Sequence, residues 1–475
     1  MIYPSYEEFL KLAGQGNLIP VYKEVSADME TPVSAFKKIA EGAKYSFLLE
    51  SVEGGEKIAR YSFLGANPKN ILKFNGKEDP FVKLKKFISQ FKPVKLPGVP
   101  RFHGGLIGYL SYDIVRFIEN IKNKNQDDLK LPLAQLMATD TILAFDHIKH
   151  KILIISNAHV LKNPKKAYDG AVKKIKLLEK KLKKPIKPAE LEVPSASGKE
   201  IKMRSNITEA QFAAMVNKTK DYIKNGDIIQ AVISQRFETE FKKKNAFNLY
   251  RLLRMINPSP YMFYLSFGQT KLVGSSPEVM VRLDGNDAVI RPIAGTRPRG
   301  ADDAQDNLMA EELLSSEKEK AEHIMLVDLA RNDLGRVCEP NSVKVTESMA
   351  IEKYSHVMHI VSNVSGKLNK NMDAFDLLKA SFPAGTVSGA PKVRAMEIIE
   401  ELENKKRGPY AGAVGYFSFS GEMDTCITIR TILINNGKAY LQAGAGIVAD
   451  SDPRAEYQET INKAKGMLKA IELSR

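Results

Sequence analysis

Short strand-forming segments follow one another through most of the chain, and this pattern limits the possible folds more than any other feature. Between about residues 20 and 160, runs rich in β-branched and aromatic residues alternate with Gly, Pro and Asn turns, as at 45–52, 105–113 and 140–156. Runs of this kind predict antiparallel strands. Similar runs follow at 231–241, 261–268, 271–283, 412–421, 426–437 and 439–448. Because the strands cluster and do not alternate strictly with helices, the sequence predicts an α+β fold.

Helical periodicity is concentrated after residue 205. We predict helices at about 207–225, at 308–334, at 389–404 and from Asp452 onward. A stretch containing Pro and Ser at about 187–200 is the clearest boundary. A chain of 475 residues suits two domains or one large intertwined domain. We expect an N-terminal domain at 1–160, a Lys-rich helix and linker at 161–200, and a second domain at 201–475.

The positive charge of the chain comes largely from one segment. The formal net charge is +15, and residues 161–190 contain 11 Lys against three acidic residues, which contributes +8. Within this segment Val172, Ile175, Leu178 and Leu182 recur at helical spacing, with lysines on the other faces. The pattern is typical of a solvated amphipathic helix. Aromatic residues that would stack on bases are nearly absent from it, so we expect no nucleic-acid partner.

The sequence also predicts where the protein works. It begins MIYPSYEEFLK, which has early acidic residues and lacks the apolar core of a secretory signal. No run of about 18 apolar residues occurs, so we expect no membrane span. Cys338 and Cys426 are the only cysteines, and they lack paired spacing. This usage fits a reduced, cytoplasmic protein without a cysteine-built zinc or iron–sulfur site.

Two predicted helices each carry a pair of glutamates three residues apart. Glu319 and Glu322 share a face of one helix, and Glu456 and Glu459 share a face of the helix that Asp452 begins. Carboxylate oxygens are the ligands that Mg²⁺ prefers. Either pair by itself is better explained by exposed ion pairs with lysines. The apolar run after Glu322 predicts a largely buried first helix, however, and buried carboxylates need a cation.

A second group of residues combines glycine-rich backbone with basic side chains. Gly444, Ala445 and Gly446 end a predicted strand, where missing side chains allow a ligand to approach. Arg430 lies in a strand that otherwise reads as buried, so it needs an anionic partner, and Lys463 follows Glu459 by one turn. Ordinary turn chemistry would explain any one of these glycines. Neither a P-loop nor a GxGxxG motif is present, so nucleotide phosphates are not the obvious anion.

The stretch 291–300, RPIAGTRPRG, contains two prolines, two glycines and three arginines. We interpret it as a rigid turn that brings backbone close to an anion. Ala294 at its centre is either unimportant or marks a place where a reactive side chain must be absent. His356 and His359 lie in a strand-like run, where a spacing of three puts them on opposite faces. Either histidine alone is more often a hydrogen-bonded core residue than a functional one.

Nine segments of the chain together resemble the motifs of anthranilate synthase component I, the chorismate-binding subunit of that enzyme. They are FLLESVEGG (47–55), ARYSFLG (59–65), GSSPE (274–278), PIAGTRPRG (292–300), EHIMLVDLARND (322–333), PAGTVSGAPK (383–392), GPYAGAVGY (408–416), GAGIVADSDP (444–453) and ETINKA (459–464). The resemblance covers nearly the whole chain. It implies the fold of chorismate-utilising enzymes, a large two-part β-sheet sandwich flanked by helices. It also implies a regulatory domain at 1–160 and a catalytic domain at 201–475.

The resemblance implies a role for individual residues. Glu322 and Glu459 would ligate Mg²⁺, with Glu319 and Glu456 holding it through water. Glu278 matches the general acid that protonates the departing ring hydroxyl, and His359 matches the histidine linked to pyruvate elimination. The positions that match chorismate contacts are Gly295, Thr296, Tyr410, Arg430, Gly444, Ala445, Gly446 and Lys463. The implied reaction adds ammonia at ring C2 with loss of the C4 hydroxyl, forming aminodeoxyisochorismate, and then eliminates pyruvate to leave anthranilate.

Two positions discriminate between related reactions. Aminodeoxychorismate synthase typically has a lysine at the position of Ala294, and isochorismate synthases have one at the position of Gln230. Neither position carries an amine here, so the resemblance favours ammonia as the nucleophile, with these two enzymes as the alternatives. A basic nucleic-acid-binding protein is the alternative from another class.

The resemblance also implies partners. The chain contains no glutamine-amidotransferase motif, so ammonia would come from a separate amidotransferase small subunit, in a heterotetramer of two large and two small subunits, or from free ammonium. L-tryptophan would inhibit the enzyme by feedback at a site that includes Ser51 and the segment Pro260, Tyr261 and Met262.

Overall fold

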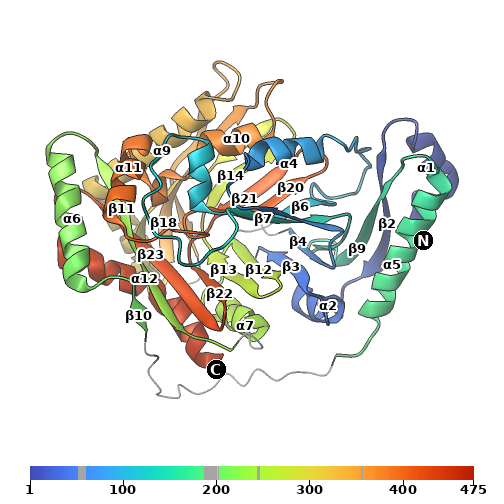
Figure 1. Ribbon diagram of the computed structural model, residues 1–475, viewed down its shortest axis with the longest axis horizontal. Coiled ribbons are helices and arrows are strands. Elements are labelled where there is room, and N and C mark those ends of the chain that lie inside the picture. Colours follow the sequence, from blue (N-terminus) through green and yellow to red (C-terminus); the bar gives the residue numbers. More distant parts are fainter. Residues whose placement is uncertain (52–59, 187–200, 202, 243–245, 355–356, 475) are drawn as a thin grey trace.

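Two antiparallel sheets form the centre of the molecule (Figure 1). The computed structural model describes residues 1–51, 60–186, 201, 203–242, 246–354 and 357–474. The larger sheet has 13 strands in the order β1-β2-β9-β8-β4-β3-β12-β13-β22-β23-β11-β10, with β19 paired to β11. The second sheet has ten strands in the order β16-β18-β15-β14-β21-β20-β6-β7-β5, with β17 paired to β18.

The strands are mostly short, as the alternating sequence pattern predicted. Those of the larger sheet are β1 (Ile2–Tyr3), β2 (Leu18–Ser26), β3 (Tyr45–Glu50), β4 (Tyr61–Ala66), β8 (Thr141–Asp146), β9 (Lys151–His159), β10 (Arg204–Ser205), β11 (Gln230–Glu240), β12 (Tyr261–Phe267), β13 (Thr270–Ser276), β19 (Gly389–Ala390), β22 (Thr431–Asn435) and β23 (Lys438–Ile447). Those of the second sheet are β5 (Asn70–Phe74), β6 (Gly105–Leu110), β7 (Ala134–Thr139), β14 (Val279–Asp284), β15 (Asp287–Ile290), β16 (Ile293–Pro298), β17 (Lys344–Lys353), β18 (Val357–Lys367), β20 (Ala413–Ser418) and β21 (Met423–Ile427).

Helices cover the outer faces of the two sheets. They are α1 (Tyr6–Leu12), α2 (Pro32–Ile39), α4 (Pro80–Ile88), α5 (Pro164–Leu182), α6 (Glu209–Lys224), α7 (Ala246–Ile256), α8 (Asp303–Ser315), α9 (Glu317–Gly335), α10 (Ala374–Ser381), α11 (Lys392–Leu402) and α12 (Pro453–Leu473), with 3₁₀ turns η1 (Tyr112–Phe117) and η3 (Gly385–Val387). In the described part of the chain, no helix has the length and apolar character needed to cross a membrane.

The sandwich follows from the period of two along each strand, because successive side chains point to opposite faces. On β3, Phe47 packs into the core between the sheets, whereas Leu48 packs against the helices that cover the larger sheet. Tyr109 of β6 enters the core between the sheets from the other side, and Leu110 packs against the helices of the second sheet. The prediction of an α+β, two-part sheet sandwich flanked by helices is confirmed.

Both sheets combine strands from the beginning and the end of the chain. β3 pairs with β12, with Phe47 opposite Leu265, and β6 pairs with β20, with Ile107 opposite Tyr416. The strands of residues 1–160 are therefore hydrogen-bonded to strands of residues 201–475 in each sheet. The division into a regulatory and a catalytic domain stays a prediction. The two predicted domains do not have separate sheets, because each sheet contains strands from both.

Helix boundaries differ from prediction in two places. The helix predicted at 308–334 is two helices, because the Ser316 side chain accepts a hydrogen bond from the Glu319 backbone N–H and begins α9 anew. The helix predicted at 389–404 is shorter, and Pro391 lies just before its first residue. The last helix begins as predicted, with the Asp452 side chain capping it and Pro453 in its first turn.

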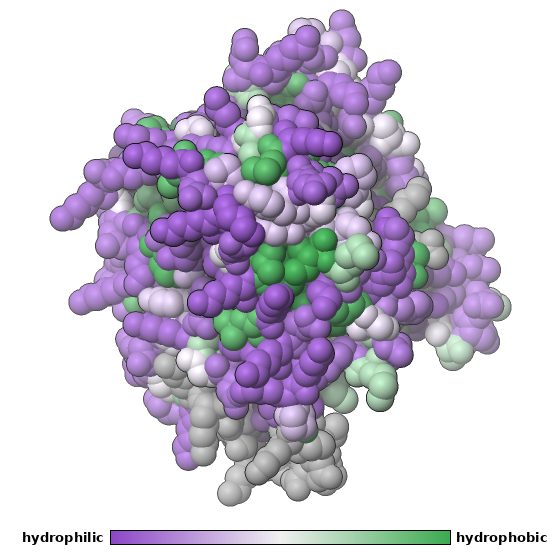
Figure 2. Space-filling view, turned by 90° about the vertical axis from the view of Figure 1, so that its right-hand side faces the viewer, coloured by the Kyte–Doolittle hydropathy of each residue, from purple (hydrophilic) through white to green (hydrophobic). Residues whose placement is uncertain are grey.

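The Lys-rich helix α5 lies at the edge of the molecule. Ala171, Ile175 and Leu182 are buried against the larger sheet and α2, and most of its lysines are exposed. The face turned to the viewer in Figure 2, on the side where α5 lies, is largely hydrophilic around one small hydrophobic patch. The predicted amphipathic helix is confirmed. The linker predicted at 187–200 lies outside the described residues.

Candidate active site and a second cavity

The segment 291–300, called the loop below, contains the bulged strand β16, which pairs with β18, and it also runs close to α9. Gly295 has a φ of +64°, and a Cβ at this position would lie 2.7 Å from Leu313 Cδ1 and 3.0 Å from Glu319 Oε2. A side chain would therefore be both strained and crowded, and glycine is required. The loop brings its backbone against the acidic start of α9.

The three arginines of this loop bind carboxylates of the chain itself. Arg291 Nη2 lies 2.5 Å from Glu352 Oε1, Arg297 Nε lies 3.0 Å from Glu312 Oε1, and Arg299 Nε lies 2.9 Å from Asp306 Oδ2. The predicted rigid turn is wrong, because this segment pairs with β18 as the bulged strand β16, and the anions that pair with its guanidinium groups are internal. Their role is thus to hold the loop in place.

His359 on β18 faces this loop. Its Nδ1–H donates to the Gly295 carbonyl oxygen at 2.7 Å, and Thr296 Oγ1 lies 3.1 Å from the same nitrogen. The Tyr354 ring packs edge-on against the imidazole, with centroids 5.7 Å apart. Burial lowers the pKa of His359; the hydrogen bond to Gly295 opposes this, and the positive charge of Arg430 adds to it. A neutral imidazole with Nε2 as its basic nitrogen results. His356 lies outside the described residues.

The two predicted glutamate pairs approach each other from α9 and α12. Burial raises the pKa of Glu322, and the negative charges of Glu319 and Glu459 raise it further. Burial also raises the pKa of Glu456, with Glu459 adding to the effect. Such mutual effects need short separations, so helices more than 100 residues apart in sequence bring their acids together. Helix α9 is less buried than predicted, because Ile324 is 50% exposed.

These carboxylates are not arranged as a finished ligand cluster. Among the residues that the structure describes, no three Asp, Glu, His or Cys side chains stand close enough together to hold a metal ion as they are. Glu322 Oε1 lies 3.5 Å from Gln230 Nε2, and the Glu459 side chain is 47% exposed. The carboxylate oxygens that could bind a metal ion are present, and their negative charges repel one another.

Lys463 connects the acidic helices to the glycine-rich strand β23. Its Nζ lies 2.6 Å from Glu459 Oε1 and donates to the Gly444 carbonyl oxygen at 3.0 Å. A Cβ on Gly444 would lie 2.8 Å from the Tyr410 hydroxyl oxygen, and one on Gly446 would lie 2.3 Å from Gln230 Nε2. The small residues therefore let polar groups of neighbouring segments approach the backbone of β23.

Arg430 and Tyr410 lie together beside this strand. Arg430 joins β21 to β22 with a φ of +48°, and its carbonyl oxygen accepts a hydrogen bond from the Ser275 N–H at 3.1 Å. Burial lowers the pKa of Arg430, against the effects of Tyr410 and Glu459. Burial raises the pKa of Tyr410 to about 12. The expected partner anion of Arg430 is not supplied by an ion pair with the described residues, which leaves the guanidinium available for a ligand.

Glu278 precedes β14 and is 8% exposed. Burial raises the pKa of Glu278 to about 8, although the nearby Thr386 hydroxyl and the positive charge of Lys463 both lower it. The carboxyl group therefore carries a proton at neutral pH. A buried carboxylic acid of this kind is suited to proton donation.

The predicted site residues lie together. Their contacts and mutual charge effects close a ring through Gly295, Glu319, Glu322, Glu459, Lys463, Gly444, Tyr410, Arg430 and His359, and back to Gly295. Glu278, Thr296, Ala445, Gly446 and Glu456 adjoin members of this ring. The individual roles assigned to them stay predictions. The arrangement can hold an anion on Arg430, donate a proton from Glu278 and accept one at His359.

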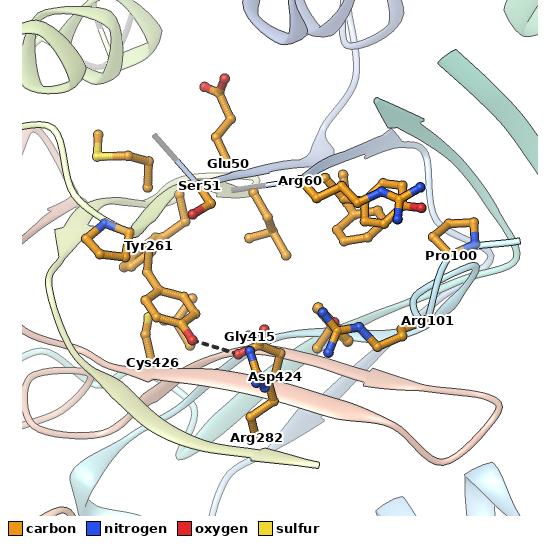
Figure 3. A pocket seen from close by; sticks show the side chains of 18 of the residues that line it. Glu50, Ser51, Arg60, Pro100, Arg101, Tyr261, Arg282, Gly415, Asp424 and Cys426 are labelled. Carbon is orange, nitrogen blue, oxygen red and sulfur yellow. Dashed lines mark hydrogen bonds between the residues drawn. The ribbon is translucent and has the colours of Figure 1, made fainter. Parts of the chain in front are cut away.

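A second cavity, of about 610 Å³, lies between the two sheets (Figure 3). All four residues predicted to contact an inhibitor, Ser51, Pro260, Tyr261 and Met262, line it. Its lining comes from both halves of the chain, because β3 supplies Ser51's neighbours and β21 supplies the opposite wall. The structure thus brings together two motifs that are about 210 residues apart in sequence.

Charged groups of both signs surround this cavity. Tyr261 donates to Asp424 Oδ1 at 3.0 Å, and burial raises the pKa of Asp424 against the charge of Arg282. Burial also raises the pKa of Glu50, but its carboxyl points away from the cavity and contacts Tyr250 and Arg254 of α7. In Figure 3, Arg60 and Arg101 lie on the side opposite Tyr261. The lining therefore contains both carboxylates and guanidinium groups, with Arg282 beside Asp424 and Arg101 paired with Asp284.

Sequence patterns had missed several of these groups. Thr386 lies within the quoted motif at 383–392, but a threonine in a glycine-rich turn has no distinguishing pattern. Glu50 directly precedes Ser51, and an acid at the end of an apolar strand was an available signal. Arg101 and Asp424 carry no local signal, since only the pairing of distant strands brings them to the cavity.

Comparison with known proteins identifies the family. A profile of the chorismate binding enzymes matches residues 44–469. Anthranilate synthase component 1 from Acetivibrio thermocellus is 51% identical, over 99% of this chain and 99% of that protein. The crystal structure of anthranilate synthase component I from Streptococcus pneumoniae has a TM-score of 0.79 at 38% identity, covering 94% of this chain and 99% of that one.

A more distant structure shares the fold alone. The menaquinone-specific isochorismate synthase from Escherichia coli has a TM-score of 0.72 at 19% identity, covering 98% of each chain. The family profile and the relatives that match over almost their full length together show the family of this chain. The chain belongs to the family of chorismate binding enzymes.

Proposed function

We propose that this protein is the large subunit of an anthranilate synthase, which converts chorismate and ammonia to anthranilate and pyruvate as the first step of tryptophan synthesis. The observation that carries the proposal is the closed ring of contacts and charge effects among residues from seven segments of the chain. Its members offer an anion-binding arginine and a neutral imidazole, and the adjoining Glu278 offers a protonated carboxyl. The sequence identity of 51%, over 99% of the chain, to an anthranilate synthase component 1 supports the same conclusion.

In the first step, ammonia attacks ring C2 while the C4–O bond breaks. Glu278 donates its proton to the departing hydroxyl, which leaves as water, and its pKa of about 8 keeps that proton available at neutral pH. Arg430 binds the enolpyruvyl carboxylate, with Tyr410 beside it and the backbone of Gly444, Ala445 and Gly446 against the substrate. The product of this step is aminodeoxyisochorismate.

In the second step, His359 Nε2 accepts the proton from C2, the bond between C3 and the enolpyruvyl oxygen breaks, and the ring becomes aromatic. The hydrogen bond from Nδ1–H to the Gly295 oxygen supports this role, because it fixes the tautomer with the lone pair on Nε2. The low pKa that burial gives His359 keeps this nitrogen unprotonated.

The carboxylates of α9 and α12 fit a hard divalent cation. Glu322 feels the like charges of Glu319 and Glu459, and a cation would offset this repulsion. Glu322 and Glu459 would hold Mg²⁺ directly, and Glu319 and Glu456 through water. Bound there, Mg²⁺ supplies neutralisation of the ring carboxylate and fixes the ring.

Two related reactions are the alternatives, namely those of aminodeoxychorismate synthase component I and isochorismate synthase. Ala294 is buried beside β18, and Gln230 bonds Glu322, so neither position offers an amine. Purified protein with chorismate, ammonium and Mg²⁺ should therefore form fluorescent anthranilate. A non-aromatic amino product or isochorismate in its place would contradict the assignment.

The ammonia would come from a separate glutamine amidotransferase subunit, in a heterotetramer of two large and two small subunits. We expect the isolated chain to use ammonium but not glutamine, and to use glutamine once the candidate partner is added. We also place the protein in the cytoplasm, where its two free, buried cysteines stay reduced.

The second cavity is proposed as the feedback site for L-tryptophan. Its carboxylates and guanidinium groups suit the two charges of a free amino acid, and the apolar walls around Met262 and Phe263 suit an aromatic ring. Cys426 lines the cavity four residues before Arg430, so the two sites share strand β21 and the loop that follows it.

A Ser51→Phe variant should escape feedback inhibition without loss of catalysis. The larger side chain would occupy part of the cavity, so the inhibition constant for L-tryptophan should rise about tenfold or more. Steady-state rates measured against tryptophan concentration check this. A Ser26→Phe variant, exposed at the end of β2, should keep normal inhibition. Unchanged inhibition in Ser51→Phe would contradict the proposed site.

A further inference from the structure

Arg299 makes more contacts than the other arginines of the loop. Its Nε lies 3.0 Å and 2.9 Å from the two carboxylate oxygens of Asp306, and its Nη2 lies 2.5 Å from Oδ2. The backbone N–H of Gly300 donates to the same carboxylate at 2.7 Å. This bidentate pair holds the end of the loop against the first turn of α8.

Asp306 is built to anchor this arginine. It is 2% exposed, and the hydrogen bonds from Arg299 and from the Gly300 backbone hold its pKa far below the usual range. A Cβ on Gly300 would lie 2.6 Å from the Asp306 nitrogen, so the loop and the helix are in close backbone contact. The carboxylate stays charged at any working pH, and the anchor is permanent.

The remaining donor of Arg299 reaches a different segment. Its Nη1 donates to the carbonyl oxygen of Tyr354 at 2.7 Å. The Tyr354 ring packs edge-on against the His359 imidazole, with an interplanar angle of 61°. The other support of His359 is the Gly295 carbonyl, which lies four residues before Arg299 in the same loop. Arg299 therefore joins the two segments that support the imidazole, and the pairing of β16 with β18 also holds the Gly295 segment.

We propose that Arg299, anchored by Asp306, is a positioning residue that sets the orientation of the His359 imidazole. It touches no reacting atom. It acts by joining the loop that carries the Gly295 carbonyl to the segment that carries the Tyr354 ring. This inference rests on the proposed function, in which His359 acts only at the second step.

The two-step reaction gives this role a specific signature. Loss of the Arg299 contacts lets the imidazole turn, so proton removal from C2 slows. Proton donation and carboxylate binding in the addition step are assigned to Glu278 and Arg430, which do not contact Arg299. Weaker chorismate binding at Gly295 and Thr296 would lower overall turnover and would not by itself raise the ratio of intermediate to product. The amino intermediate should then accumulate, because it forms faster than it is consumed. A general loss of folding would lower both steps alike and would not produce it.

The experiment compares Arg299→Gln and Arg299→Lys with the wild type in full-length protein. Chorismate, ammonium and Mg²⁺ are supplied, reactions are quenched, and chorismate, the non-aromatic amino intermediate and anthranilate are separated and quantified. We expect the ratio of intermediate to anthranilate to rise by about tenfold to a hundredfold in Arg299→Gln. The isolated intermediate should yield fluorescent anthranilate when given to wild-type enzyme.

The lysine variant keeps the inference testable if the glutamine variant folds poorly. Lys keeps a charge for Asp306 but cannot also reach Tyr354 with a second planar donor, so the ratio should still rise. Arg394→Gln removes a similar pair with Asp227 far from the loop and should leave the ratio unchanged. If folded Arg299 variants consume chorismate and form anthranilate in the wild-type proportion, the inference is overturned. A wild type that makes no anthranilate overturns the proposed function together with it.

Discussion

A Glu322→Gln variant should lose Mg²⁺-dependent turnover by about 10³-fold or more. A bound cation that neutralises substrate charge lowers the activation free energy by several kcal/mol, and the variant would lack one of the ligands that hold the cation. The substitution keeps the size and shape of the side chain and removes one negative charge. In the structure that charge is partly buried and opposed by Glu319 and Glu459. The fold should therefore be as stable as that of the wild type when no metal is present.

The measurement is anthranilate formation over a range of Mg²⁺ concentrations, together with thermal unfolding in the presence of a chelator. Glu317→Gln is the matched control, since Glu317 lies on the same helix with a side chain that is 89% exposed. It should keep full activity. Normal turnover in Glu322→Gln would show that this carboxylate is not a ligand.

A Glu278→Gln variant should lose about 10² to 10⁴-fold in turnover, which is the usual contribution of a general acid. Glutamine has nearly the same size and shape as the protonated glutamate, but its amide has no acidic proton to donate. Chorismate binding should change little, because binding is assigned to Arg430 and the β23 backbone. The loss should thus appear in kcat and much less in KM.

The pH profile separates this role from a structural one. In the wild type, turnover should fall as the pH rises through about 8, where Glu278 loses its proton. The variant should lack that limb of the profile. The control is Glu238→Gln, which removes the partly exposed ion-pair partner of Lys438 near the C-terminal end of β11. This variant should keep the wild-type pH profile. A wild type whose rate stays level to pH 10 would contradict the assignment.

The free energy of unfolding should decrease with rising pH because of the titration of Glu278. The pKa of Glu278 is raised from 4.5 to about 8 in the folded chain, so between these values the folded state binds more protons than the unfolded state. The contribution of this group to stability is present at low pH and is lost as the pH rises from about 4.5 to about 8. The glutamine variant should not show this part of the decline.

The fold was predictable in class because its information is local. Alternating apolar residues, as in Phe47 and Leu48, assign strands and faces without knowledge of partners. The order of strands was not predictable, since β3 pairs with β12 across more than 200 residues. The split of one predicted helix at Ser316 was missed, because a serine cap among good helix formers looks like helix interior.

The site was predictable through its motifs and not through spacing. Paired glutamates and glycine-rich turns each had an ordinary explanation. Only the series of family motifs, found in the same order along the chain, predicted that these residues form one site. The pairing of Arg299 with Asp306 could not be foreseen, although they are seven residues apart, because nothing in the sequence says which acid the loop turns toward. The groups of the second cavity, such as Asp424, depend entirely on tertiary contacts.

The pairing of β3 with β12 and of β6 with β20 determines when the nascent chain can finish folding. During synthesis the first 160 residues leave the ribosome with both strands lacking one neighbour, and the missing strands follow about 100 to 260 residues later. Unpaired strand edges attract other chains. A truncated gene product ending near residue 160 should therefore aggregate, and it would lack the strands that complete the second cavity.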